Sequence, residues 1–585
     1  MIEKNLQLLR EMMKKDDVQA YIIPTADYHH SEYVGDYFKA RAFMTGFTGS
    51  VGTLIVTQEE ACLWVDGRYF IQADKQVYNT SIKVMKMGLP GVPTTKEYIE
   101  KQIDPLQQSI TIGFDGRLLA AKEVLSLLSL PIHVHLCDYI SSLWVDRPTL
   151  SCEPGFLYDL KYCGESRTSK IARVREKMEN SKYHIITTLD DIAWLFNIRG
   201  KDVHCNPVVL AYAMITPDQA YLYVQNGTFN ASDITVLKQD GVTIKEYSEI
   251  YEDIKQISDT VMLDSQTVNY TIYQSIHAPI IDRYNPSQQF KAIKNDIEIE
   301  NTIQAHIKDG VAVTKFMYWL KNNITKIPMD EVSVANVLQK LREEQPLFYD
   351  LSFETICAYK ENAAQMHYQA TPENHKKLQP EGLLLIDSGG QYLDGTTDIT
   401  RTFALGPISE EESRDFTITL RAFLRLQNAI FLEGTNGVTL DQLARGMAYQ
   451  YHLDYRCGTG HGVGHFLNVH EGPNGFRPVN RPNARPISNQ MPGMVTTDEP
   501  GVYKEGKHGI RLENELLCVL DEKNEYGQFL SFQPLTMCPI DKDAIDYTML
   551  TDEEVDQLNA YHQLVATTLA PYLTEAENEW LQKII

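Results

Sequence analysis

The sequence predicts an α/β (α+β) protein with a duplicated N-terminal α/β module and a C-terminal domain of different architecture. Three observations support this fold class. Helical and strand-like segments alternate along residues 1–155, which is typical of α/β units. The pattern of residues 41–69 recurs at 192–224. From about residue 297 a long helical periodicity begins, and strands and turns follow it.

The length of the chain calls for more than one domain. With 585 residues it exceeds what one hydrophobic core ordinarily serves, so roughly two to four domains are expected. Its apolar content of 43% and charged content of 23% are those of a globular protein. The changes in pattern predict two α/β domains, a C-terminal domain and a helical extension, at residues 1–155, 156–296, 297–540 and 541–585.

The first module begins with an amphipathic segment. Leu6, Leu9 and Met13 fall at helical spacing and predict a first helix with one apolar face. Strand signals follow in QAYIIP, GTLIVTQ and ACLWVDGRYF, with the turn-rich GFTGSVG between the first two. Both copies of the repeat run from a helix end through a glycine-containing loop into two strands joined by a turn. We therefore predict a duplicated module whose first copy ends near Pro154 and Gly155.

The C-terminal part has longer helices. EIENTIQAHIKDGVAVTKFMYWLKNN carries apolar residues at sustained helical spacing and predicts one long helix. The last forty or so residues predict two helices around Pro571. Thr551 followed three residues later by Glu554 is typical of a capping box at the start of the first of them.

Charge and cysteine usage exclude some functions. The net charge of −24 argues against a nucleic-acid partner, because phosphate backbones are bound by basic surfaces. The nine cysteines are scattered and odd in number, which is typical of a reducing compartment. No apolar run approaches the roughly eighteen residues of a membrane span. The sequence therefore predicts a cytoplasmic protein with no membrane partner.

Five polar residues carry the strongest functional signal. Each lies at the edge of an apolar run, beside glycine or a turn, and a buried carboxylate is costly unless a positive group pairs with it. No comparable set of Lys and Arg lies nearby in the sequence, so the predicted partner is metal, and four carboxylates balance two divalent cations. Carboxylates with one imidazole suit Mn, Co, Fe or Zn, and the oxygen-rich set favours Mn. The five are Asp387, Asp398, His461, Glu499 and Glu513.

Two predicted hairpins bring the carboxylates together in pairs. Asp394-Gly395 is a hairpin signal between Asp387 and Asp398, and Gly506 lies midway between Glu499 and Glu513. Acidic residues commonly flank turns without any function, so one pair alone would carry little weight. Two pairs with a histidine between them favour a centre of two metals.

The histidine lies in a segment of alternating glycines, GTGHGVGH. In an extended strand the glycines share one face, where another backbone can approach closely, and His461 lies on the other. Val463 and His465 break the GxGxxG dinucleotide pattern, and HGVGH lacks the Glu of a helical HExxH zinc motif. The glycines concerned are Gly458, Gly460, Gly462 and Gly464.

These motifs together resemble a known family. DGTTDITRTF, GTGHGVG, NVHEGP, TDEPGVY and GIRLENE resemble the pita-bread metallopeptidases, and within them the X-Pro aminopeptidases of the long, three-domain cytosolic type. DYHHSEY, RAFMTGFTGSVGT, WVDGRYF and DIAWLFNIRGKDVHCNPV resemble the creatinase-like domains of that family. The resemblance implies two creatinase-like domains followed by a pita-bread catalytic domain.

The resemblance also implies how the metals are held. Asp398 and Glu513 would bridge two divalent cations, usually Mn2+ in the family, with Asp387 on one and His461 and Glu499 on the other. A hydroxide between the cations would attack the carbonyl of an N-terminal X-Pro bond and release the first residue. The substrates would be peptides with proline in the second position, and their free amine would lie against the metals.

Four residues would act on the substrate. In the family pattern Glu499 accepts and shuttles the proton, while His367 and His470 orient the peptide and stabilise the oxyanion. Phe353 falls where the family places a wall beside the proline ring. The resemblance also implies a homodimer formed through the C-terminal domain, which is expected here by analogy.

The sequence departs from the family pattern at one position. Cys457 stands four residues before His461, where relatives often carry a second histidine, so proline preference or rate is expected to differ. His465, where relatives often have a small residue, is a hypothetical substitute. Two alternatives remain open at this point: a prolidase-like dipeptidase, and a non-catalytic peptide-binding relative that would be expected to lack metal ligands.

Overall fold

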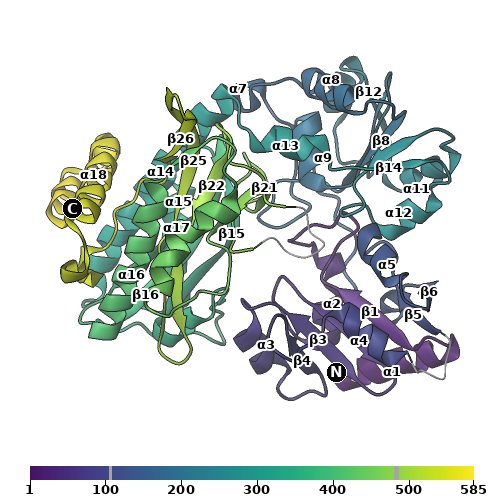
Figure 1. The fold of residues 1–585 in the computed structure, drawn as a ribbon, viewed down its shortest axis with the longest axis horizontal. Helices are drawn as coiled ribbons and strands as arrows, with labels where there is room; N and C mark the ends of the chain where they lie inside the picture. Colours follow the sequence, from purple (N-terminus) through teal and green to yellow (C-terminus); the bar gives the residue numbers. More distant parts are fainter. Residues whose placement is uncertain (104–108, 480–485) are drawn as a thin grey trace. The chain divides into compact units, whose positions relative to one another are not determined.

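The computed structural model describes residues 1–103, 109–479 and 486–585, and confirms the α/β fold class (Figure 1). The chain forms two compact units. The first consists of Met1–Tyr158 and Glu165–Ser287, and the second of Asp159–Gly164 and Gln288–Ile585. The finer division into four domains stays a prediction. In the described part of the chain, no helix has the length and apolar character to cross a membrane.

The first unit begins with a mixed six-stranded sheet of order β4-β3-β2-β1-β5-β6. Strands β1, β2 and β3 pair antiparallel, and the outer pairs are parallel. The predicted first helix is confirmed, with Leu6, Leu9 and Met13 fully buried. The strands are β1 Ala20–Pro24, β2 Thr53–Thr57, β3 Ala61–Val65, β4 Lys83–Lys86, β5 Ile110–Phe114 and β6 Ile132–Leu136. The helices are α1 Ile2–Lys15, α2 Ala40–Thr45, α3 Phe70–Val77, α4 Thr95–Gln102, α5 Ala121–Leu127 and α6 Ile140–Leu143.

A second six-stranded sheet repeats this topology, with order β12-β11-β10-β8-β13-β14. The predicted duplication is thus confirmed: in each copy the first strand is followed by an antiparallel hairpin, and Thr57 and Thr216 occupy the same turn position. The strands are β8 Tyr183–Ile186, β10 Ala211–Ile215, β11 Ala220–Val224, β12 Val242–Glu246, β13 Val261–Leu263 and β14 Ile280–Asp282, with β7 Phe156–Leu157 pairing β9 Ile198–Arg199. The helices are α8 Arg167–Lys177, α9 Leu189–Phe196, α10 Ala231–Gln239, α11 Ile250–Asp253 and α12 Tyr270–Ser275.

A buried histidine connects the two copies inside the first unit. His29 Nδ1 lies 2.9 Å from the carbonyl oxygen of Thr187, and its Nε2 lies 2.7 Å from the hydroxyl of Tyr247. Burial lowers the pKa of His29, so the neutral ring forms these bonds. The Asn269 side chain also donates to the carbonyl oxygen of Tyr28 at 2.9 Å.

The second unit places long helices against two antiparallel sheets (Figure 1). Helix α14 packs beside α15, and α16 beside α17. One sheet has the order β15-β16-β17, with β18 also paired to β16, and the other has the order β19-β26-β25-β22-β20-β21. The helices are α7 Leu160–Cys163, α13 Pro286–Ala292, which begins in the first unit, α14 Asp296–Asn323, α15 Glu331–Glu343, α16 Glu410–Gln427, α17 Gly437–Tyr449, α18 Asp552–Leu569 and α19 Glu575–Ile584.

The core of the second unit lies between these helices and the first sheet. Phe316 of α14 packs with Phe403 and Leu384 of the sheet, and all three are fully buried. Burying each such side chain contributes about 2–3 kcal/mol. The strands are β15 Phe348–Tyr359, β16 Leu383–Tyr392, β17 Gly395–Thr396, β18 Ile399–Ala404, β19 Ile430–Leu432, β20 Gly460–Gly462, β21 Glu471–Phe476, β22 Val495–Asp498, β23 Gly501–Lys504, β24 His508–Arg511, β25 Asn514–Asn524 and β26 Gly527–Pro534.

The helical predictions for this unit are confirmed. The long periodic segment is α14, and the tail forms α18 and α19 on either side of Pro571. Thr551 caps α18, since its hydroxyl accepts from the amide of Glu554 while the Glu554 carboxylate accepts from the amide of Thr551. These two bonds satisfy donors that the start of a helix leaves unpaired.

Candidate metal centre

The first predicted hairpin brings Asp387 and Asp398 together. Asp387 lies on β16, and Asp398 directly precedes β18. The two strands pair antiparallel with Asp387 opposite Thr400, so the side chain of Asp398 enters the same space as that of Asp387. Leu393 and Asp394 make the turn and Gly395 begins β17 opposite Tyr392, so the turn lies one residue earlier than the predicted Asp394-Gly395.

The second predicted hairpin brings Glu499 and Glu513 together. Strands β23 and β24 pair from Gly501 opposite Arg511 to the turn around Gly506. Gly506 has φ +73°, a conformation that residues with a side chain rarely adopt. The two glutamates flank the open end of this hairpin, where their carboxylates meet.

His461 reaches the cluster from β20. A Cβ atom on Gly460 would lie only 1.8 Å from the carbonyl oxygen of Thr497 on β22, so glycine allows these strands to approach. The sequence predicts an extended strand through Gly464, but in the structure β20 ends at Gly462. Pairing with β21 shifts after His461, and the chain then folds back so that the Gly464 amide donates to the carbonyl of Asn468 at 2.9 Å.

Six side chains converge on one small space. All five residues predicted to bind metal are present, together with His470. Their oxygen and nitrogen atoms form overlapping sets, and within each set these atoms lie no more than 4.8 Å apart. The sets are Asp387, Asp398 and Glu513; His461, Glu499 and Glu513; and Asp398, His461 and His470.

The cluster carries an excess of negative charge. Burial raises the pKa of Asp398 well above its usual value, and the neighbouring carboxylates, Asp387 first among them, raise it further. Burial and Asp398 do the same to the pKa of Glu513. These shifts mean that the ionised carboxylates repel one another when no cation lies between them.

The carboxylates fit a bound cation. Asp387 Oδ2 accepts from Arg511 at 2.5 Å, while the buried Oδ1 has no hydrogen-bond partner among the residues that the structure describes. Glu513 Oε2 accepts from the hydroxyl of Thr400 at 2.7 Å. Protein donors thus orient both carboxylates, as is usual for metal ligands, and a buried oxygen without a partner is a position that a cation can satisfy.

The geometry of His461 also fits that of a metal ligand. His461 Nδ1 lies 2.9 Å from the carbonyl oxygen of Gly462, which can only accept, so Nδ1 carries the proton. The lone pair of Nε2 then faces Asp398 Oδ2 at 3.4 Å and Glu499 Oε1 at 3.6 Å. A neutral imidazole held by a carbonyl at Nδ1, with Nε2 among carboxylates, is the arrangement of a metal-binding histidine.

Sequence reasoning missed Arg511, which is the buried cation beside the cluster. Its guanidinium donates to Asp387, to the hydroxyl of Tyr503 at 2.6 Å and to that of Thr400 at 3.1 Å. The signal was available, since Arg511 stands two residues before Glu513, and such residues share a face in extended chain.

The predicted substrate residues lie on segments next to the strands that build the cluster. The rings of His470 and His461 meet edge to face, with centroids 4.2 Å apart. His367 follows Met366, whose carbonyl oxygen accepts from Arg511 at 3.4 Å. Phe353 is half-buried on β15, opposite Gly389 of β16. The roles of these residues stay predictions.

The two positions that depart from the family pattern differ in their surroundings. The carbonyl oxygen of Cys457 accepts from Arg445 at 2.7 Å. His465 is buried, with Nδ1 3.0 Å from the hydroxyl of Thr302 and Nε2 3.0 Å from the carbonyl oxygen of Tyr162. Both ring nitrogens are therefore engaged away from the cluster, and the substitution of His465 for the missing histidine stays a hypothesis that this geometry does not favour.

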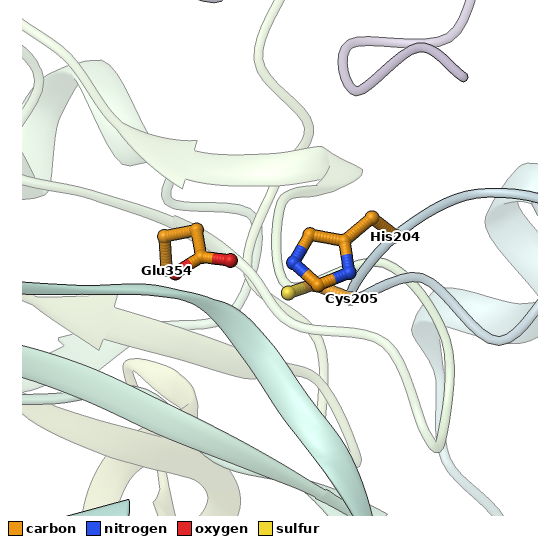
Figure 2. Close-up of side chains that lie close together, drawn as sticks. All are labelled: His204, Cys205 and Glu354. Carbon is orange, nitrogen blue, oxygen red and sulfur yellow. The ribbon is translucent and has the colours of Figure 1, made fainter. Parts of the chain in front are cut away.

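Three further polar side chains are drawn in Figure 2. Glu354 is exposed on β15 in the second unit, next to Phe353. His204 and Cys205 follow β9 in the first unit, where His204 is exposed and Cys205 is buried (Figure 2). They belong to separate units and do not contribute to the cluster described above.

Comparison with known families gives matches along nearly the whole chain. The Creatinase/Prolidase N-terminal domain matches residues 5–131, and a second model of that description matches 146–298. Metallopeptidase family M24 matches residues 300–519, and the C-terminal region of peptidase M24 matches 528–585. Fold and cluster therefore define a metallopeptidase of family M24.

Individual relatives narrow this class. A probable Xaa-Pro aminopeptidase P from Laccaria bicolor is 38% identical over 613 residues, which covers 99% of this chain and 92% of the relative. X-prolyl aminopeptidase from Caenorhabditis elegans, described as a cytosolic enzyme with a di-nuclear active site, superposes with a TM-score of 0.94 at 31% identity and covers 100% of this chain and 99% of that one. The chain belongs to the X-Pro aminopeptidases of family M24.

A more distant structure shares the fold alone. The prolidase from Pyrococcus horikoshii superposes with a TM-score of 0.50 at 22% identity. The match covers 63% of this chain and 99% of the prolidase.

Proposed function

We propose that this enzyme removes the first residue from peptides that have proline in the second position, by hydrolysis at a centre of two divalent cations. One observation carries the proposal: among the described residues, four carboxylates and His461 converge, with the single charge of Arg511 paired to Asp387. Their excess negative charge is what two divalent cations would balance. The oxygen-rich ligand set favours Mn2+ over Zn2+, Co2+ or Fe2+.

The proposed ligand assignment follows the overlapping sets. Asp387, Asp398 and Glu513 would hold one cation, and His461 and Glu499 would hold the second together with the shared carboxylates. Asp398 and Glu513 would serve both cations, since they are the carboxylates that belong to two of the sets and a carboxylate has two oxygens to offer. When bound, such cations supply a nucleophile from water at neutral pH and polarise the scissile carbonyl.

The protein's own groups keep the ligands oriented before substrate binds. Arg511 fixes Asp387 and Thr400 fixes Glu513. Glu515 accepts the amide proton of Asp398 at 2.7 Å, which holds the backbone of that residue in place. A site fixed in this way reorganises little during the reaction, which lowers the barrier.

Three groups are proposed to handle protons and the peptide. Glu499 is half-buried and would take the proton released by the attacking water, then pass it to the leaving proline nitrogen. His470, beside His461, would donate a hydrogen bond to the oxyanion, and His367 would orient the peptide. Phe353 would pack against the proline ring.

The test is release of free arginine from Arg-Pro-Pro, with and without Mn2+. The proposal predicts arginine release that depends on metal and is lost in Asp398→Ala, while Asp521→Asn, at an exposed position of β25, retains it. The dipeptide Arg-Pro is the second substrate. Cleavage of Arg-Pro in preference to the tripeptide would assign a prolidase instead, and no release from either would reject the peptidase.

A further inference from the structure

Asp441 and Arg445 form a buried ion pair on α17, next to the segment that carries His461. Arg445 donates from Nε to Asp441 Oδ2 at 2.6 Å and from Nη2 to Asp441 Oδ1 at 3.0 Å. Both side chains are fully buried, and the guanidinium lies over the ring of Tyr455 at 4.1 Å. A buried Arg–Asp pair of this geometry is rigid, because two parallel hydrogen bonds fix its orientation.

This ion pair forms hydrogen bonds with the backbone of Cys457 and the side chain of Thr459, which shortly precede His461. Arg445 Nη2 also donates to the carbonyl oxygen of Cys457 at 2.7 Å. The hydroxyl of Thr459 donates to Asp441 Oδ1 at 2.7 Å, so the hydroxyl of Tyr455 must donate to Thr459, at 2.5 Å. These bonds link one helix turn to the strand that enters the cluster.

The same segment also holds Glu499. The amide of Glu499 donates to the carbonyl oxygen of Thr459 at 2.7 Å. Thr459 therefore stands between two proposed ligands, two residues before His461 in sequence and bonded to the backbone of Glu499. A displacement of Thr459 would move both ligands together.

The set of three carboxylates, Asp387, Asp398 and Glu513, is oriented by other groups than the Asp441–Arg445 pair. Arg511 orients Asp387, Thr400 orients Glu513, and Glu515 holds the amide of Asp398. None of these bonds, all among described residues, involves Asp441, Arg445, Tyr455 or Thr459. The two halves of the cluster thus have separate supports.

We propose that Asp441, Arg445, Tyr455 and Thr459 form an α17 platform that positions His461 and Glu499, and that it sets the affinity of one of the two metal positions. The inference rests on the proposed dinuclear centre. These are positioning residues, which act through the ligands. Groups that orient metal ligands from behind typically change metal affinity by about 10- to 100-fold when removed.

The test compares two substitutions at one residue. Thr459→Val keeps the shape of the side chain but removes the hydroxyl, and Thr459→Ser keeps the hydroxyl. Mn2+ is titrated into metal-free protein by calorimetry, and electron paramagnetic resonance reports whether bound Mn2+ ions are coupled or isolated. Arg421→Lys serves as a matched control, because Arg421 pairs with Glu554 at 2.9 Å between α16 and α18.

The platform predicts that Thr459→Val binds the first Mn2+ like the wild type and the second about 10- to 100-fold more weakly, with the spectrum of isolated Mn2+. Thr459→Ser and Arg421→Lys should retain the coupled pair. Arg445→Lys, which keeps the charge but loses the paired bonds, should behave like Thr459→Val. Unfolding temperatures of the metal-free variants show whether each one folds.

Other results overturn the inference. If Thr459→Val binds both ions normally, or weakens both equally, the α17 platform does not support one half of the centre. Equal losses in Thr459→Val and Thr459→Ser would also exclude the hydroxyl as the connection. If the wild type itself fails to bind two ions, the proposed function fails, and the inference fails with it.

Discussion

Arg511 shows how one side chain can order a crowded anionic site. It contacts Asp387, Tyr503 and Thr400, and Thr400 in turn donates to Glu513. A guanidinium can make several directed bonds at once, whereas an ammonium group acts as a point charge. Arg511 therefore orients ligands on both hairpins without occupying a proposed metal position.

We expect Arg511→Lys to fold and to lose activity. Lysine keeps one positive charge but cannot reproduce the bonds to three partners, so Asp387 would be less well oriented. The expected loss is about 10- to 100-fold in kcat/KM on Arg-Pro-Pro, with weaker Mn2+ binding. Steady-state kinetics and elemental analysis of the same sample measure both effects. Unchanged kinetics would show that Arg511 only balances charge.

A second prediction at this scale concerns two glycines. Gly460→Ala would place a Cβ 1.8 Å from the carbonyl oxygen of Thr497, so β20 and β22 would have to separate. We expect a loss of about 3 kcal/mol or more in the stability of the second unit, measured by denaturant unfolding. Gly446→Ala is the control, because no atom of the described chain segments lies within 4 Å of its Cβ position on α17.

The control substitution, Gly446→Ala, is expected to change stability in the opposite direction. Alanine favours a helix interior over glycine, so Gly446→Ala should raise stability by about 0.5–1 kcal/mol. Similar destabilisation by both substitutions would contradict the close strand approach inferred at Gly460.

At the scale of elements, a buried histidine attaches helix α18 to the rest of the second unit. His562 Nε2 accepts from the amide of Ile540 at 3.0 Å, which requires the neutral ring. Burial, with smaller contributions from Lys542 and Arg401, lowers the pKa of His562 to about 4. Protonation therefore breaks this attachment.

The pH dependence follows from that pKa. The unfolded chain takes up the proton near pH 6.5, whereas the folded chain resists it until about pH 4. The stability that His562 contributes is thus complete above pH 6.5 and falls as the pH drops toward 4, by about 3 kcal/mol in all. Hydrogen exchange of α18 should accelerate between pH 7 and pH 5 once corrected for the intrinsic pH dependence of exchange.

The comparison variant is His562→Gln, which cannot gain this proton. The extra acceleration of exchange in α18 should disappear in it, while exchange in α14 keeps its normal dependence. An unchanged pH response in His562→Gln would show that another group destabilises α18 in acid.

At the scale of the whole molecule, sequence patterns predicted what depends on local spacing. The duplicated module, the capped α18 and the two acidic hairpins all follow from periodicity or turn chemistry within short segments. The prediction of five converging residues rested on the same local signals, and their convergence is seen in the structure. Their role as metal ligands stays a prediction.

Features that depend on distant contacts were not predictable in this way. The end of β20 at Gly462 is set by backbone bonds to Asn468 and to β21. The α17 platform joins Asp441 and Thr459 through side chains whose spacing has no recognisable pattern. The engagement of His465 by Thr302 and Tyr162 could not be read from its neighbours in sequence either.

The most direct test of the whole account is a crystal structure of the enzyme grown with Mn2+, with anomalous scattering used to locate the metal. The account predicts two Mn2+ peaks among Asp387, Asp398, His461, Glu499 and Glu513, with Asp398 and Glu513 contacting both. A single peak, or none at these side chains while the protein is active, would contradict it.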